Sequence, residues 1–368
     1  MKAAESTRYP DTSAAQGIST RYAHHHEATA PPHHRDRTRG CRREESASLV
    51  LSRTLLCSDT AIEQYGATWR QIDSTLRFLP LPRDRKLAAE EIERIDLAVF
   101  SADMWAEQRG PSFFKVLLQA PHPKWLHMFA AGVDHPVLAE VRRRGCRLTH
   151  SAGSSAVPIA HTVIMHVLAL CRGARAFAVA QSAHEWAESD VVDVEGRTMG
   201  IIGLGNIGVE VARLAQQFGM RVIGLRRTPR GDEPCETWPT SRLHELLPLI
   251  DVLVLTAPLT PDTLGMIGAD ELTLLPTGAH VVNVGRGQVI DESALAAALA
   301  SGHLGGAALD VFVVEPLPVE SPLWDLPNVT ITPHSAGGTP LATVRAAEIF
   351  ADNLGRYVRG EPLRNEVL

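Results

Sequence analysis

The chain has 368 residues, of which 45% are hydrophobic and 21% are charged, with a formal net charge of -6. This composition is typical of a soluble globular protein, and the length allows two domains with separate cores. The net charge gives no reason to expect nucleic acid as a partner, and no apolar stretch approaches the roughly 18–20 residues of a membrane span. Five cysteines without a Cys-x-x-Cys pair favour reduced thiols in a cytoplasmic protein over disulfides or a zinc site.

Residues 1–47 differ in composition from the rest of the chain. They are rich in Arg, His, Ser, Thr and Ala and hold almost no large aliphatic residues. Such a segment buries too little apolar surface to offset the entropy lost on ordering, so we expect a disordered extension. Its histidine runs at 24–26 and 33–34 are expected to be solvated rather than to hold a metal.

From residue 48 the pattern changes to short apolar runs that alternate with polar or helical segments. This alternation predicts an α/β unit of roughly 100 residues. We expect strands at 49–56, 76–81, 96–101, 125–130 and 147–150 and a helix at 137–144, whereas the run 115–118 is too short to assign. The four tryptophans considered as walls of a substrate pocket are expected to be core residues instead: Trp69, Trp105, Trp125 and Trp324.

A junction rich in small residues and proline, at 151–158, is typical of a hinge. Beyond it, apolar residues on most faces of the segment 159–186 predict one long helix that is buried between domains or subunits. His161 and His166 lie on this helix five residues apart, which is not the i, i+4 spacing of a metal pair. We therefore expect packing or interface histidines there and no metal site.

The segment 198–208, Thr-Met-Gly-Ile-Ile-Gly-Leu-Gly-Asn-Ile-Gly, organises the second part of the chain. Its apolar run ends in a Gly-x-Gly-x-x-Gly motif, and helical spacing follows until Gly219. Strand, glycine turn and helix in this order predict a dinucleotide-binding site. Gly203 allows the tight turn, Gly205 lets the backbone approach a pyrophosphate, and Gly208 lets the helix pack close to the strand.

Further βα units continue from this motif. Several of their strands are almost continuously apolar, as parallel strands covered on both faces are. We expect strands at 221–225, 251–256, 280–284, 307–311 and 329–332, and helices at 243–247, 270–274, 292–301 and 340–359. The tail 361–368 is expected to return to the first unit.

Three functional side chains follow the ends of three predicted strands. Arg286 follows the strand at 280–284, Glu315 the strand at 307–311, and His334 the strand at 329–332. Ligands of such sheets bind outside the carboxyl ends of the strands, so these loops should form one site. Arginine can grip a carboxylate with two hydrogen bonds, histidine can exchange a proton, and a glutamate can stabilise the imidazolium. Together they predict a hydride-transfer site.

From residue 48 onward the chain resembles the D-isomer-specific 2-hydroxyacid dehydrogenases, including glyoxylate/hydroxypyruvate reductase-like and phosphoglycerate dehydrogenase-like members. The resemblance rests on the order and spacing of the segments 131–134, 200–208, 258–263, 283–287, 308–316 and 333–337. It implies that His334 is the acid/base, that Glu315 is its partner, and that Arg286 binds the substrate.

The same resemblance implies further site residues. The backbone of Ala131, Gly132 and Val133 would help to hold the substrate carboxylate. The implied cofactor contacts, besides the three motif glycines, are Asn206, Ile207, Pro258, Val284, Asp310, and the loop from His334 to Gly337.

The fold implied by the resemblance is α/β with two Rossmann-like lobes, each built on a parallel sheet, and an active site in the interdomain cleft. Residues 48–151 plus 338–368 would form a discontinuous substrate domain, and residues 152–337 the dinucleotide-binding domain. Family members are usually homodimers, so a cytoplasmic homodimer without a nucleic acid or membrane partner is expected. His161 stands where the family often has an acidic residue, and we interpret it as an altered interface or packing contact.

The end of the strand at 221–225 bears on the choice between NAD and NADP. NAD enzymes typically carry Asp or Glu there to bind the ribose 2′-hydroxyl. This chain has Arg226, Arg227 and Thr228 instead, and these groups would bind a 2′-phosphate. We therefore expect NADP(H) to be favoured over NAD(H), the alternative being that these are solvent-facing cations.

The main hypothesis is an NAD(P)H-dependent reductase of a small 2-keto acid such as glyoxylate or hydroxypyruvate. A formate-type dehydrogenase is an alternative, disfavoured because formate oxidation transfers no O–H proton and would not need Glu315 with His334. A non-catalytic NAD(P)-sensing corepressor or scaffold is a second alternative, disfavoured by the presence of all three site residues.

Overall fold

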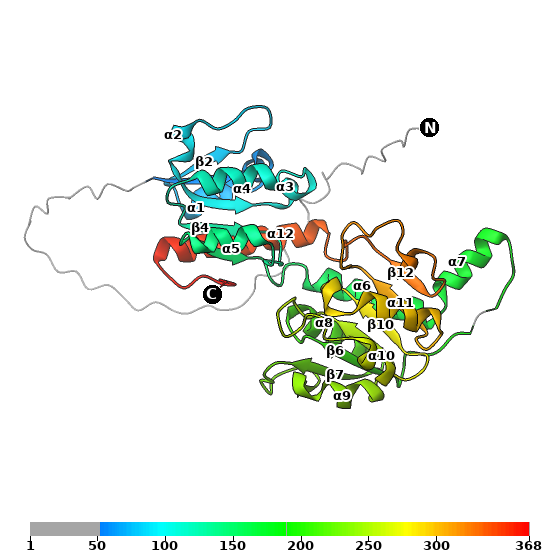
Figure 1. The fold of residues 1–368 in the computed structure, drawn as a ribbon. Helices are drawn as coiled ribbons and strands as arrows, with labels where there is room; N and C mark the ends of the chain where they lie inside the picture. The colour runs from blue at the N-terminus through cyan, green and yellow to red at the C-terminus, as the bar shows by residue number, and fades with distance from the viewer. Residues whose placement is uncertain (1–51, 189, 368) are drawn as a thin grey trace, which may run out of the picture. The chain divides into compact units, whose positions relative to one another are not determined.

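The computed structural model describes residues 52–188 and 190–367. They form two sheets in which every strand pair is parallel, with helices between the strands, so the predicted α/β class is confirmed (Figure 1). The extension predicted at 1–47, with its histidine runs, and the start of the strand predicted at 49–56 lie outside the described residues.

The first sheet has five strands in the order β2-β1-β3-β4-β5. The strands are β1 (Arg53–Cys57), β2 (Leu76–Pro80), β3 (Ile95–Phe100), β4 (Trp125–Met128) and β5 (Arg147–His150). The helices among them are α1 (Asp59–Ile72), α2 (Ala89–Ile92), α3 (Ala102–Ala106), α4 (Gly110–Gln119) and α5 (Pro136–Arg143). The run 115–118, which the sequence pattern leaves unassigned, is therefore part of a helix, because Phe113 and Leu117 bury one face of α4 in the core.

The last helix, α12 (Pro340–Arg359), packs against this first sheet although it is distant in sequence. The ring of Phe350 lies 4.8 Å from that of Trp69 and 5.3 Å from that of Trp125, measured between centroids. The tail then pairs Glu366 with Thr149 in an antiparallel bridge. The C-terminal tail thus returns to the first unit, as the sequence analysis expects.

The second sheet has seven strands in the order β12-β11-β10-β9-β6-β7-β8. The strands are β6 (Thr198–Ile202), β7 (Arg221–Arg226), β8 (Glu236–Pro239), β9 (Val252–Leu255), β10 (His280–Asn283), β11 (Gly306–Leu309) and β12 (Val329–Ile331). The α-helices that follow them are α8 (Asn206–Gln217), α9 (Leu243–Leu246), α10 (Ala269–Leu274) and α11 (Glu292–Ala300). The edge strand β8 is not predicted from the sequence, because its polar residues and proline hide the strand pattern.

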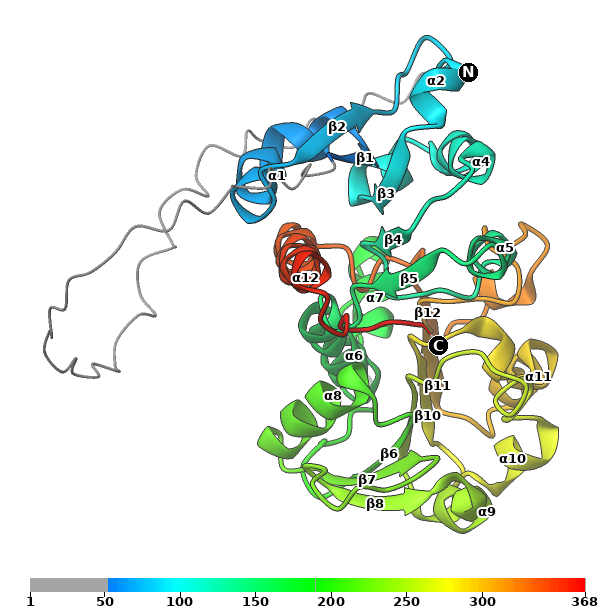
Figure 2. The ribbon, with the colours of Figure 1, turned by 90° about the vertical axis from the view of Figure 1, so that its left-hand side faces the viewer.

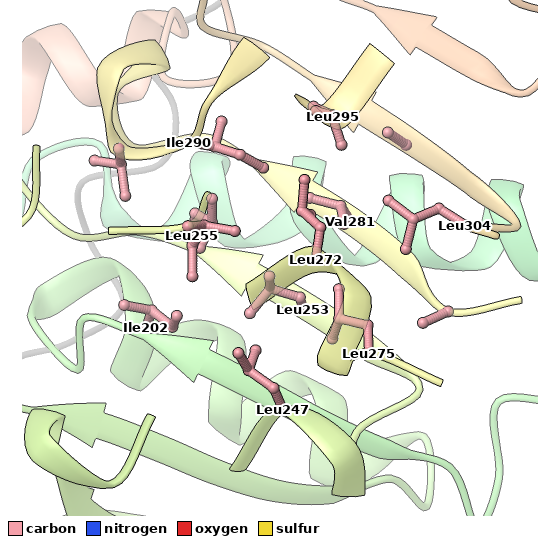
Figure 3. Close-up of a cluster of buried hydrophobic side chains, with 14 of the residues drawn as sticks. Ile202, Leu247, Leu253, Leu255, Leu272, Leu275, Val281, Ile290, Leu295 and Leu304 are labelled. Atoms are coloured by element: carbon pink, nitrogen blue, oxygen red, sulfur yellow. The ribbon is translucent and has the colours of Figure 1, made fainter. Parts of the chain in front are cut away.

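Helices cover both faces of the second sheet (Figure 2). On one face, Leu272 and Leu275 of the α10 segment and Leu295 of α11 pack on apolar strand residues such as Leu253 and Val281 (Figure 3). On the other face, α6 (Ala156–Cys171) and α8 pack on a second apolar cluster that includes Ile201, Val254 and Val282. Burial on both faces explains why these strands are almost continuously apolar.

The segment predicted as one helix from 159 to 186 is instead two helices, α6 (Ala156–Cys171) and α7 (Ala174–Ala183). Gly173, with a φ of +63°, takes a left-handed conformation that interrupts the helix. Most of α6 is apolar and packed, whereas α7 has no buried residue. Over 52–188 and 190–367, no single helix is long and apolar enough to cross a membrane; only α6 and α7 taken together, bent by 64°, pass that test.

The expectation that all four tryptophans are core residues is wrong for two of them. Trp69 and Trp125 are core residues, but Trp105 is 69% exposed and Trp324 is 44% exposed. His166 is buried on α6, as expected of a packing histidine, and its Nε2 has no hydrogen-bond partner.

Candidate functional site

The glycine motif joins β6 to α8, as the sequence predicts. Gly203 has a φ of +103°, and a Cβ there would lie 2.6 Å from the backbone nitrogen of Ala257. A Cβ on Gly208 would overlap the carbonyl oxygen of Gly203. By contrast, a Cβ on Gly205 would have no described atom within 4 Å apart from those of its two chain neighbours and the backbone of α8. The fold therefore requires Gly203 and Gly208, whereas Gly205 leaves an open surface on the turn.

The open surface adjoins the N-terminus of α8. Gly205 is the N-cap residue of this helix and, as a glycine, offers no side chain to accept the first N–H groups. The first N–H groups of a helix lack acceptors within the helix and lie at the positive end of its dipole, which favours a bound phosphate. Asn206 and Ile207 are the first two helical residues, and Asn206 lies near Gly153 in the junction after β5. These residues fit the pyrophosphate of a dinucleotide.

Arg226 lies at the end of β7 and is held by an acidic residue. Its Nη1 donates to Oε1 of Glu233 at 2.8 Å. The same carboxylate accepts the backbone N–H groups of Arg230 and Gly231, each at 2.8 Å. The backbone N–H of Arg230 is the main cause that lowers the pKa of Glu233 to about 2. Glu233 thus stays charged and closes the loop that follows β7.

Arg227 and Thr228, in contrast, are exposed on this loop. The Arg227 side chain is 76% exposed, and its Nη2 lies 3.6 Å from Oδ2 of Asp262, which is equally open to solvent. Arg227 is therefore the more accessible of the two arginines that the sequence analysis assigns to a 2′-phosphate.

Arg286 lies in a tight loop after β10. The buried Asn283 shapes this loop, because its Oδ1 accepts the N–H of Gly285 at 3.0 Å and its Nδ2 donates to the carbonyl of Arg286 at 3.1 Å. A Cβ on Gly285 would lie 2.8 Å from the carbonyl oxygen of Ala257, and one on Gly287 would overlap the backbone of Phe312. The two glycines therefore let the loop pack between the segments that follow β9 and β11.

The guanidinium of Arg286 binds Asp134, which follows β4 of the first sheet. Nε of Arg286 donates to Oδ2 of Asp134 at 2.8 Å, and Nη2 lies 3.3 Å from Oδ1. The hydrogen bond from Arg286 is the main cause that lowers the pKa of Asp134, and the charge of His334 acts in the same direction. A Cβ on Gly132 would overlap Nη2 of Arg286. Arg286, Asp134 and Gly132 thus lie in direct contact, and the Arg286 loop also reaches the segment of Glu315, because Gly287 packs against the backbone of Phe312.

His334 and Glu315 form a direct pair. Nδ1 of His334 lies 2.7 Å from Oε2 of Glu315, and Oε1 of Glu315 accepts the backbone N–H of Phe312 at 3.1 Å. The imidazole is about half exposed, and its Nε2 has no hydrogen-bond partner among residues 52–188 and 190–367. One ring nitrogen is therefore held by a carboxylate while the other is available to a ligand.

Asp310 holds the loop that carries His334. Its carboxylate is almost completely buried and accepts the hydroxyl of Thr332 at 2.5 Å and the backbone N–H groups of Ser335 at 2.9 Å and Ala336 at 3.1 Å. The backbone N–H of His334 also donates to the carbonyl of Asp310 at 2.8 Å. The structure therefore gives the Asp310 side chain a positioning task within the protein.

The other predicted cofactor residues also follow strand ends of the second sheet. Val284 is buried directly after β10, and the exposed Pro258 follows β9. Gly337 follows β12, and a Cβ there would lie 3.1 Å from Cβ of Ser155. Ala131 and Val133 flank Gly132 after β4. These predicted substrate and cofactor residues therefore occupy loops at carboxyl ends of strands.

Sequence reasoning missed two residues of this region, Asp134 and Glu233. Asp134 belongs to the segment Ala-Gly-Val-Asp that carries part of the resemblance, but only tertiary contact reveals its bond to Arg286. Glu233 follows the arginines after β7 by a few residues, and only the folded loop shows that its side chain is buried and paired with Arg226. His161 is exposed on α6, so of the two contacts predicted for it, interface or packing, only the interface contact stays a prediction. No group of His, Cys, Asp and Glu suited to a metal ion occurs among the residues that the structure describes.

Comparisons with known proteins identify relatives of the chain. A family model described as D-isomer specific 2-hydroxyacid dehydrogenase, NAD binding domain, matches residues 164–336. The chain is 33% identical to the glyoxylate reductase of Korarchaeum cryptofilum over 289 residues, which cover 76% of this chain and 85% of that protein. It is 36% identical to glyoxylate/hydroxypyruvate reductase B of Yersinia enterocolitica over 257 residues, which cover 68% of this chain and 78% of that protein.

A solved structure agrees with these sequence relatives. The NADPH-dependent glyoxylate/hydroxypyruvate reductase of Sinorhizobium meliloti, in complex with NADP and sulfate, superposes with a TM-score of 0.70 and 30% identity. The match covers 86% of this chain and 98% of that chain. The similarity therefore extends over both sheets.

Proposed function

The chain belongs to the D-isomer-specific 2-hydroxyacid dehydrogenases, NAD(P)-dependent oxidoreductases that act on the CH–OH group, and we propose that it reduces a small 2-keto acid to the hydroxy acid. The observation that carries the proposal is the hydrogen bond between His334 and Glu315, next to the loop of Arg286, in which Gly287 packs against Phe312. A proton donor and a carboxylate-binding cation are the groups that reduction of a 2-keto acid requires.

Each of these residues has a distinct task in the proposed reaction. Arg286 binds the substrate carboxylate together with the backbone from Ala131 to Val133, and so fixes the carbonyl group. A dinucleotide held at the turn of Gly203, Gly205 and Gly208 would supply the hydride for the carbonyl carbon. His334 delivers a proton from Nε2 to the carbonyl oxygen, while Glu315 holds Nδ1 and stabilises the imidazolium. In the reverse direction the same imidazole accepts the proton.

The proposed domain roles follow the two sheets. The first sheet with α12 and the tail is assigned to the substrate domain (48–151 plus 338–368), and residues 152–337 to the dinucleotide-binding domain. The packing of Phe350 of α12 on Trp69 and Trp125 supports this discontinuous assignment.

We propose NADP(H) as the preferred cofactor. The loop after β7 has an exposed Arg227 and Thr228, and its one well-covered acid, Glu233, is already bound to Arg226 and two backbone N–H groups. A 2′-phosphate could therefore bind the guanidinium of Arg227 and the hydroxyl of Thr228. The carboxylate of Glu233 would not repel it strongly, because that charge is already paired. The relative from Sinorhizobium meliloti is named as NADPH-dependent, which is consistent with this proposal.

We propose a cytoplasmic homodimer as the working form. The support lies in α6 and α7, where Met165, Phe177 and Val179 are 52%, 42% and 61% exposed, an apolar surface that a second copy would cover. The cysteines of the described chain are free thiols, which suits a reducing compartment. Light scattering should give twice the chain mass, and Phe177→Glu with Val179→Glu should give the monomer.

The decisive experiment measures oxidation of NADPH and NADH by the purified protein against glyoxylate, hydroxypyruvate and a panel of further 2-keto acids. We expect turnover with at least one 2-keto acid and a lower KM for NADPH than for NADH. Reduction of NADP or NAD by formate, without turnover of any keto acid, would establish the formate-type alternative. Binding of NADPH without turnover of any substrate would establish the non-catalytic alternative.

A further inference from the structure

We propose that Asp134 is a positioning residue for substrate recognition, which fixes Arg286 so that two of its N–H groups point to the substrate carboxylate. The proposal rests on the proposed function, because it assumes that Arg286 binds a carboxylate. Asp134 lies in the loop after β4 and Arg286 in the loop after β10, so the contact joins residues of the two sheets.

The hydrogen bonds that Arg286 makes within the protein use three of its N–H groups and leave two for a ligand. A guanidinium carries one N–H on Nε and two on each terminal nitrogen. Asp134 takes the Nε–H at 2.8 Å and one N–H of Nη2 at 3.3 Å, and the carbonyl of Gly285 takes one N–H of Nη1 at 2.7 Å. One N–H on each terminal nitrogen remains. A bidentate carboxylate needs two parallel donors of this kind.

The backbone of the Asp134 loop restricts Arg286 on a further side. A Cβ on Gly132 would overlap Nη2 of Arg286 and would lie 3.2 Å from Oδ1 of Asp134. The guanidinium therefore lies directly against the backbone segment that is proposed to hold the same substrate carboxylate. Asp134 and Gly132 together define where the remaining N–H groups can point.

The charge of Asp134 is better suited to positioning Arg286 than to stabilising the folded protein. Its side chain is 43% exposed and that of Arg286 is 27% exposed, and ion pairs this open to water contribute little to folding. The hydrogen bond from Arg286 is the main cause that lowers the pKa of Asp134, so the carboxylate stays charged at neutral pH. The removal of this charge should therefore leave the fold intact and act on the substrate.

The test compares Asp134→Asn and Asp134→Ala with the unmodified protein, using the best 2-keto acid of the panel and its uncharged methyl ester. We expect the KM for the acid to rise about 10-fold or more. A rise of this size corresponds to the loss of one well-placed charge-assisted hydrogen bond. The KM for the ester and the dissociation constant of NADPH, measured by fluorescence titration, should change little. Asp193→Asn is the matched control, because it removes an exposed acid from another arginine pair, with Arg172 at 3.3 Å.

Other outcomes separate this inference from the proposed function. A lower KM for the acid would show that Asp134 competes with substrate for Arg286, and would overturn the proposal. An unchanged KM for the acid, or an equal rise for acid and ester, would overturn it too. If Arg286→Leu removes the preference for acid over ester while the Asp134 variants keep it, only the inference about Asp134 fails. If the unmodified protein reduces no keto acid, the proposed function itself fails.

Discussion

Nδ1 of His334 lies 2.7 Å from Oε2 of Glu315, although the two residues are 19 positions apart in the chain. Two local contacts hold this geometry. The Phe312 N–H fixes the other oxygen of Glu315, and the carbonyl of Asp310 accepts the backbone N–H of His334. The imidazole is therefore oriented before any ligand binds.

Replacement of His334 by Asn should lower kcat by about 10²- to 10⁴-fold, because the variant loses the group that exchanges the proton. The KM for cofactor should change only modestly, since His334 is not part of the phosphate turn. Steady-state kinetics with the best keto acid measure both quantities. Glu315→Gln, which keeps the size of the side chain but not its charge, should give a smaller loss of kcat. Near-normal turnover of His334→Asn would remove this residue from its proposed role.

Two glycines of the phosphate turn should respond differently to alanine. A Cβ on Gly205 meets no described atom within 4 Å, so Gly205→Ala should fold normally but bind NADPH more weakly, because the methyl group would project toward the pyrophosphate. A Cβ on Gly208 overlaps the carbonyl of Gly203, so Gly208→Ala should lower the free energy of unfolding by about 1–3 kcal/mol. Thermal unfolding and fluorescence titration separate the two effects. Unweakened NADPH binding by a folded Gly205→Ala protein would contradict the assignment of that surface.

Cofactor preference should depend on the arginines after β7. Arg227→Ala should raise the KM for NADPH about 10-fold or more, as expected for one charge-assisted hydrogen bond, with little change for NADH. Arg226→Asp should narrow or reverse the preference, but it also places a second carboxylate beside Glu233, so Arg227→Ala is the cleaner variant. The measurement is kcat/KM for both cofactors. Equal use of NADPH and NADH by the unmodified protein would contradict the proposed preference.

Buried histidines should make the protein sensitive to mild acid. Burial lowers the pKa of His127 to about 3, and it also lowers the pKa values of His150, His166 and His280. An unfolded chain takes up these protons at about pH 6.5, whereas the folded chain takes them up only at lower pH, so stability falls as the pH drops below about 6.5. Each such histidine adds a slope of up to about 1.4 kcal/mol per pH unit.

The pH dependence can be measured by urea unfolding between neutral pH and mildly acidic pH. His127→Gln should reduce the slope, although it lowers stability at neutral pH because His127 bonds to Thr149 and Ser151. His161→Gln, a change at an exposed position of α6, controls for the loss of an imidazole. A slope that His127→Gln leaves unchanged would show that this buried histidine does not contribute.

The sequence by itself determined six of the seven strands of the second sheet and the order of its functional loops. Continuous apolar runs mark strands buried on both faces, and the glycine spacing marks the phosphate turn, because both depend on neighbouring residues. Parallel topology then places the loops of Arg286, Glu315 and His334 at one edge. For this reason these residues could be chosen before their contacts were known.

Only the tertiary structure decided which partners these residues have. The bond from Arg286 to Asp134 spans 152 positions, and that from Arg226 to Glu233 depends on how one loop folds back. The break between α6 and α7 depends on the left-handed backbone at Gly173. The apolar pattern of the sequence continues across this residue and so does not reveal the break. Local spacing predicts which face of an element is apolar, but a contact between distant segments depends on the packing of the whole chain.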